Sequence, residues 1–143
     1  MLEKILNFLF RLETVIVDGV YLKRWHVLEL KGRGTYYLHN FVSGDSDRDP
    51  HDHPFPFKTI VLWGRYFDVE YDSNRKIARI EKMSIGRIRH RRATHLHRVL
   101  LSKKSSSCWT LVFRGKKERE WGFLTRQGWV HHKQYIDANR RSK

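Results

Sequence analysis

Two histidines one residue apart, His51 and His53, are the side chains of this sequence best spaced for chemistry. Side chains of an extended strand alternate between its two faces, so both imidazoles are expected to point the same way. Two imidazoles directed at one point are a common start of a transition-metal site. A third ligand must come from elsewhere, and we expect it to be His97, which ends the basic segment 86–97.

Three histidine ligands suit several divalent transition metals, and histidine alone does not choose among them. Such a set leaves coordination positions open, as a catalytic centre requires. We therefore predict a divalent transition metal as cofactor, and iron, zinc, nickel and manganese are all compatible with three histidines. Asp49 and His95 are predicted to support the ligands through hydrogen bonds. His95 shares its strand parity with His97 and is also a rival ligand.

The spacing around these histidines resembles the cupin family. The first cupin motif places one glycine before His-x-His and another after it, and Gly44 and Gly64 stand at or near these positions. In the second motif, Gly86 and His97 have the family spacing. The resemblance covers roughly residues 44–101 and implies a small double-stranded β-barrel, or jelly roll.

The sequence departs from the cupin motifs at several positions. The glutamate of the first motif falls on Phe57 or Lys58, and the proline, glycine and asparagine of the second fall on Arg92, Thr94 and Leu101. Without the glutamate, the chain resembles the three-histidine cupins, such as thiol dioxygenases, or a cupin that has lost its metal. The first case implies an oxygenase, with Fe(II) favoured over zinc, nickel or manganese, and the second a non-catalytic protein that binds a ligand.

Three further residues are candidates for contact with a substrate. Arginine is dense before His97, and guanidinium groups match carboxylate or phosphate. If Arg89 faces the site, the substrate is a small anion, whereas the alternative is a solvated basic surface. Tyr66 could donate a hydrogen bond to a bound substrate. Trp109 could stack on a planar substrate or, alternatively, belong to the core.

The composition is that of a globular protein with a strongly basic surface. The formal net charge is +14 over 143 residues. This charge could keep the protein soluble, attract a small anionic substrate or bind nucleic acid. One cysteine, Cys108, excludes an intramolecular disulfide and fits the cytoplasm. No apolar stretch reaches the roughly 18 residues of a spanning helix, so no membrane partner is expected.

The expected elements form one domain over residues 1–143. Apolar residues at helical spacing predict an amphipathic helix over 1–13, which would pack on the sheet or form a homodimer contact. Many short strands separated by turn residues follow and predict a mainly β fold. The tail 137–143 is expected to be frayed.

These observations predict a metal-binding, cupin-like protein, an oxygenase acting on a small anionic substrate. The alternative is a non-catalytic cupin-like protein that binds a ligand or nucleic acid. A nucleic-acid module would bind with an affinity that falls steeply with salt. A metal-free cupin would be indifferent to a chelator.

Overall fold

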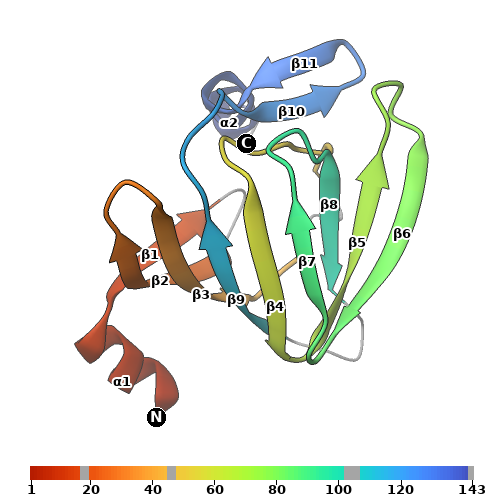
Figure 1. Ribbon diagram of the computed structural model, residues 1–143. Helices are drawn as coiled ribbons and strands as arrows, with labels where there is room; N and C mark the ends of the chain where they lie inside the picture. Colours follow the sequence, from red (N-terminus) through yellow and green to blue (C-terminus); the bar gives the residue numbers. More distant parts are fainter. Residues whose placement is uncertain (17–19, 45–47, 102–106, 142–143) are drawn as a thin grey trace.

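The computed structural model describes residues 1–16, 20–44, 48–101 and 107–141, which fold into antiparallel sheets with a helix near each end (Figure 1). The six-stranded sheet has the order β1-β2-β3-β9-β4-β7 and the three-stranded sheet the order β6-β5-β8. The strands of the six-stranded sheet are β1 (Arg11–Ile16), β2 (Val20–Leu30), β3 (Gly34–Phe41), β9 (Cys108–Arg114), β4 (Phe57–Trp63) and β7 (Ile88–Arg91). Those of the three-stranded sheet are β6 (Ile77–Ser84), β5 (Arg65–Tyr71) and β8 (His97–Leu101).

Both sheets contribute to one hydrophobic core. Its central cluster takes one buried side chain from each of the strands β4, β5, β6, β8 and β9: Val61, Tyr66, Met83, Val99 and Cys108. Alternation along the strands places every second residue inside, as in the buried–intermediate pattern of β9. Burial raises the pKa of the Cys108 thiol to about 12, so this cysteine is a packed thiol and not a nucleophile. The predicted mainly β, double-stranded barrel is confirmed.

A hairpin closes one end of the barrel. Strands β10 (Gly122–Thr125) and β11 (Gly128–His131) pair antiparallel and lead into helix α2 (His132–Arg141), which lies beside them (Figure 1). The ring of Tyr135 stacks on Phe123 with 3.9 Å between ring centroids. Helix α2 continues through Arg141, whereas a frayed tail was expected from 137 onward. Residues 142–143 lie outside the described residues.

The N-terminal helix is shorter than predicted. Helix α1 covers Leu2–Leu9, and Phe10 already has an extended backbone, with φ −135° and ψ 147°. From Arg11 onward the chain pairs with β2, beginning opposite His26. Residues 10–13 satisfy the helical spacing of apolar side chains, but the hydrogen bonds of a sheet edge are available to them and the β-branched residues that follow favour a strand.

Helix α1 buries one apolar residue, Leu6, and leaves most of the others exposed. Polar contacts hold it against β2: the indole N–H of Trp25 donates to Asn7 at 2.7 Å, and Lys23 pairs with Glu3 at 2.9 Å. The exposed apolar side chains are Leu2, Ile5, Phe8 and Leu9. The homodimer contact expected of this helix stays a prediction. Neither described helix has the length and apolar composition needed to cross a bilayer.

Two of the motif glycines, Gly64 and Gly86, allow a matched test of backbone and steric demands. Gly64 and Gly86 both have left-handed φ angles, +79° and +77°. A Cβ at Gly64 would lie 2.6 Å from the carbonyl oxygen of Ser107, whereas a Cβ at Gly86 meets nothing within 4 Å. We expect Gly86→Ala to lower the free energy of unfolding by about 1–2 kcal/mol, the backbone strain alone. Gly64→Ala should cost about 2–5 kcal/mol, because the clash adds to the strain.

Urea denaturation of both glycine variants beside the wild type would measure this difference. Equal losses would mean that the segment around Ser107 moves aside at no cost, contrary to the prediction.

Candidate metal centre

The His-x-His segment is held between two strands that belong to different sheets. The backbones of His51 and His97 exchange two hydrogen bonds, of 3.0 and 2.9 Å, which join the segment to β8. On its other edge, the N–H of Asp52 donates to the carbonyl of Gly122 in β10 at 3.1 Å. The segment is a bridged, extended stretch and not the regular strand that its sequence suggested. Its backbone is nevertheless fixed on both sides.

Alternation along this segment separates its side chains. His51 and His53 share one face, with 5.2 Å between their ring centroids. Asp52 points the other way and is buried. Its carboxylate accepts hydrogen bonds from the Gly122 N–H at 2.8 Å, the Trp129 indole at 3.0 Å and the Arg119 guanidinium. Asp52 thus anchors the β10–β11 hairpin and does not face the histidines.

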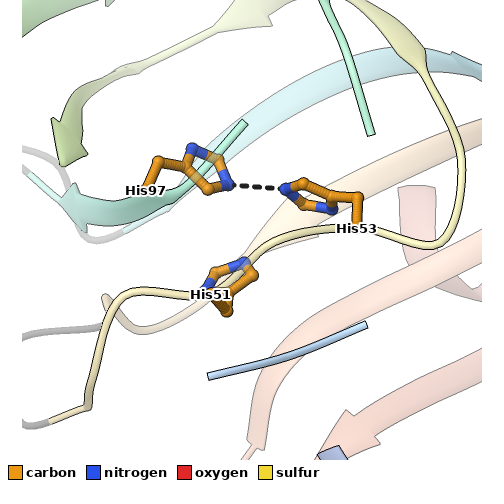
Figure 2. Close-up of side chains that lie close together, drawn as sticks. All are labelled: His51, His53 and His97. Atoms are coloured by element: carbon orange, nitrogen blue, oxygen red, sulfur yellow. Dashed lines mark hydrogen bonds between the residues drawn. The ribbon is translucent and has the colours of Figure 1, made fainter. Parts of the chain in front are cut away.

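The imidazoles of His51, His53 and His97 converge (Figure 2). The first two belong to one segment, and His97 lies 44 residues after His53. The Nε2 atoms of His53 and His97 lie 2.9 Å apart. The ring centroid of His97 lies 4.9 Å from those of both other rings. One ring nitrogen from each residue falls within 4.8 Å of the others. The structure therefore brings together the three histidines that the sequence singled out.

This arrangement fits a transition metal. Two imidazole nitrogens bound at about 2.0–2.1 Å to one ion, at an angle between about 90° and 109°, lie about 2.8–3.4 Å apart. The 2.9 Å between His53 and His97 falls in that range. Burial first, and then repulsion by His97 and His51, holds the pKa of His53 well below its usual range. His53 is therefore neutral at physiological pH, as a ligand must be.

The orientation of His97 depends on Asp68 of β5. The Asp68 carboxylate lies 2.8 Å from Nδ1 of His97, and Nε2 of His95 lies 3.1 Å from the same oxygen. Burial alone would raise the pKa of Asp68, but the two histidines outweigh it and hold the pKa well below its usual range. An ionised carboxylate only accepts hydrogen bonds, so Nδ1 of His97 carries a proton, and Nε2 is the ring nitrogen left to face a metal.

Asp68 is in turn part of a chain of buried charges. Arg91 donates to Asp68 at 3.0 Å and to Glu81 at 2.8 Å. Glu81 also accepts hydrogen bonds from Arg87 at 2.8 Å and from Arg89 at 2.6 Å. Burial would raise the pKa of Glu81, but the three arginines outweigh it and lower the pKa to about 2. A continuous ionic network thus runs from the surface of the barrel to the imidazole of His97.

Three of the predicted site residues lie elsewhere. Arg89 binds Glu81 and does not reach the histidines. Trp109 stacks on Trp25 with 5.3 Å between centroids, because its neighbours in β9 take the inward positions. Asp49 pairs with Arg75 at 2.9 Å. Arg89 and Trp109 thus make their contacts with other residues than the histidines, and the support that Asp49 was expected to give a ligand stays a prediction.

His95 lies where support for a ligand was expected, since it shares Asp68 with His97. Asp68 itself was missed. Asp68 shares one strand face with Tyr66 and Glu70, but alternation alone does not say whether that face is the inner one. Glu70 is partly exposed and lies 3.7 Å from His95. The usable signal was this shared face, because Tyr66 was already expected to reach a bound substrate.

A cavity of about 370 Å³ opens beside the three histidines. Tyr66 lines it, as the sequence suggested, and so does Phe57, whose ring centroid lies 4.6 Å from that of His53. Phe57 thus lies beside the histidines where the cupin resemblance expects a glutamate. Six further aromatic residues line the cavity: Tyr21, Tyr37, Phe41, Phe55, Trp121 and Phe123. The cations on the wall are Arg24, Arg48 and Arg114.

Two facing antiparallel sheets around a cavity that holds a histidine cluster are the cupin architecture. The chain has the cupin fold, as the spacing of its histidines and glycines predicted. Among solved structures it is similar to an RmlC-like cupin protein from Ralstonia eutropha, with a TM-score of 0.59 and 12% identity over 93% of this chain and 81% of that one. It is also similar to the polyketide cyclase RemF from Streptomyces resistomycificus, with a TM-score of 0.63 and 15% identity over 81% and 80%.

A third similar structure is the Fe(II) form of HppE, the hydroxypropylphosphonic acid epoxidase from S. wedmorenis. Its TM-score is 0.59 with 14% identity, and the match covers 73% of this chain and 56% of the epoxidase. The chain thus spans little more than half of that enzyme. At these identities the likeness shows the fold alone. No family model matches the sequence, and no curated protein matches it.

Proposed function

We propose that this protein is a metal-dependent cupin enzyme, an oxygenase that acts on a small anionic substrate. The observation that carries the proposal is the convergence of His51, His53 and His97 on the wall of an aromatic cavity. A neutral imidazole at His53, and the contact of Asp68 with Nδ1 of His97 that leaves Nε2 facing the cluster, suit metal binding. The cavity has the size of a small-molecule site.

The cofactor we propose is a divalent transition metal, with Fe(II) favoured over zinc, nickel or manganese. When bound, such a metal supplies redox or Lewis-acid chemistry at the coordination positions that three histidines leave open. A similar structure, HppE, has been described in an Fe(II) form. This likeness, at 14% sequence identity, supports the choice of iron.

The other residues of the site have roles that follow from their contacts. Asp68 holds the proton on Nδ1 of His97 and so fixes the direction in which Nε2 points. The aromatic walls lower the polarity around a bound substrate, which strengthens polar contacts inside the cavity. Burial raises the pKa of Tyr66, so its hydroxyl stays protonated and can donate a hydrogen bond to a substrate.

Oxygen consumption tests the proposal. We expect untagged protein loaded with Fe(II) under anaerobic conditions to consume dioxygen when mixed with one member of a panel of small thiols and organic acids. Metal-free protein should show no consumption with the same panel. Metal binding without turnover of any panel member would instead favour the alternative, a non-catalytic cupin that binds a ligand.

The nucleic-acid alternative draws on the net charge of +14. Three arginines of the basic run before His97 are partly neutralised, because Arg87 and Arg89 pair with Glu81 and Arg91 pairs with both Glu81 and Asp68. The positive charge available to phosphates there is smaller than the sequence indicates. We therefore favour the small anion as the partner. A cytoplasmic location, expected from the single cysteine, stays a prediction.

A further inference from the structure

Arg114, the last residue of β9, places a guanidinium group in the cavity wall without an acidic partner. Its guanidinium carbon lies 5.5 Å from the ring centroid of Tyr37 and 5.1 Å from that of Phe55, and both rings line the cavity. Its Nε–H is buried and has no hydrogen-bond partner. Within the residues that the structure describes, no carboxylate forms an ion pair with Arg114. A buried donor left unpaired is costly, which indicates that a ligand supplies the missing acceptor.

The other two cations of the cavity wall are engaged by the protein. Arg24 donates from Nε to His39 at 3.2 Å, and its Nη1 lies 3.5 Å from a carboxylate oxygen of Glu13. Arg48 donates to the carbonyl of Gly44 at 3.2 Å and lies over a tyrosine ring. Arg114 is therefore the cation of this wall whose charge and planar donor set are best available to a ligand. A guanidinium fork matches the two oxygens of a carboxylate or phosphonate.

Arg114 and the histidines lie at the same end of the barrel. The backbone of Arg114 pairs with Phe57 of β4, and the Phe57 ring lies 4.6 Å from that of His53. An oxyanion held at Arg114 would therefore leave the rest of a small ligand in the aromatic space beside the histidines. That space, about 370 Å³ in all, suits one ring or a branched chain and not an extended polar molecule.

We propose that Arg114 binds the oxyanion of the substrate, and that the substrate is a small acid with one carboxylate or phosphonate on a compact apolar body. This inference rests on the proposed function for its view of the cavity as the substrate site. Arg114 is then the residue that selects acids over their neutral analogues. It replaces Arg89, the arginine that the sequence had suggested.

Calorimetric titration of the metal-free, untagged chain tests this inference without the metal. The probes are phenylacetate, phenylphosphonate and the neutral isostere phenylacetamide. We expect wild-type protein to bind at least one of the two acids about tenfold or more tightly than phenylacetamide. Arg114→Gln should remove this preference and leave phenylacetamide binding unchanged. Arg114→Lys should restore part of it, since it keeps the charge but not the fork.

Lys116→Gln is the matched control. Lys116 is exposed two residues further on and lines a smaller outer hollow of about 220 Å³ that Arg114 also borders. Its loss removes the same charge but should leave the preference for acids intact. An equal effect of both substitutions would overturn the proposal, because the anion would then bind in the outer hollow. If Arg114→Gln fails to fold, equal affinities of the wild type for acids and amide would overturn it by themselves.

The two proposals fail separately. A protein that binds metal but shows no preference for the acids would overturn the role of Arg114 and leave the metal centre standing. A wild-type protein that holds no metal, but whose preference for acids is lost in the Arg114→Gln variant, would support the oxyanion site at Arg114. It would contradict the proposed metal-dependent enzyme.

Discussion

Alanine at position 53 is expected to abolish stoichiometric metal binding while the protein stays folded. The substitution removes the neutral imidazole whose Nε2 lies 2.9 Å from that of His97, and with it one of three converging ligands. The wild type should hold near one equivalent of a single transition metal after reconstitution, by elemental mass spectrometry on untagged protein. The affinity loss in His53→Ala should exceed the about 10–100-fold seen for residues that only support a ligand.

The control for this experiment is His90→Ala. His90 lies in β7 and is exposed, so its loss should leave the metal content unchanged. A wild type that stays free of metal after reconstitution would contradict the metal centre. So would a His53→Ala protein that retains a full equivalent.

Asparagine at position 68 is expected to have two separate effects. The oxygen of an amide can still accept from Nδ1 of His97, but the charge that fixes this proton is lost, so metal affinity should fall by about 10–100-fold. Removal of the carboxylate also leaves Arg91 with less compensation in a buried network, which should cost about 3–5 kcal/mol of stability. Metal titration and urea denaturation of Asp68→Asn measure the two effects.

The Glu81→Gln variant distinguishes an effect on the orientation of His97 from an effect on the stability of the fold. Glu81 belongs to the same network but contacts arginines and not His97. Its substitution should lower the free energy of unfolding and leave the metal affinity close to that of the wild type. If both variants lower metal affinity equally, Asp68 acts only through the stability of the network, and its role in orienting His97 is refuted.

The sequence predicted the histidine cluster and the fold of this protein better than the residues that surround the cluster. The parity of His51 and His53 depends only on the alternation of an extended backbone, which holds even in a bridged segment. The fold followed from the spacing of glycines and histidines that the cupin resemblance identified. Both features are local or carried by a motif, and neither needs knowledge of which strands become neighbours.

The errors share a different cause. Arg89 and Trp109 were assigned to the site by nearness in sequence, whereas strand alternation turns one toward Glu81 and the other toward Trp25. Asp68 was missed for the converse reason, since its contact with His97 depends on the pairing of β5 with β8. The end of α1 was misplaced because pairing with β2 competes with helical spacing. In each case, contacts with another strand rather than the local sequence decided the outcome.

The segment around His51 joins the barrel to the β10–β11 hairpin through main-chain hydrogen bonds on both edges. Such bonds do not depend on which side chains the segment carries. The scaffold therefore separates two tasks: the backbone sets where positions 51 and 53 point, and the side chains there set the chemistry. A chain built in this way can exchange one donor type for another, or lose a ligand altogether, while the barrel keeps its shape.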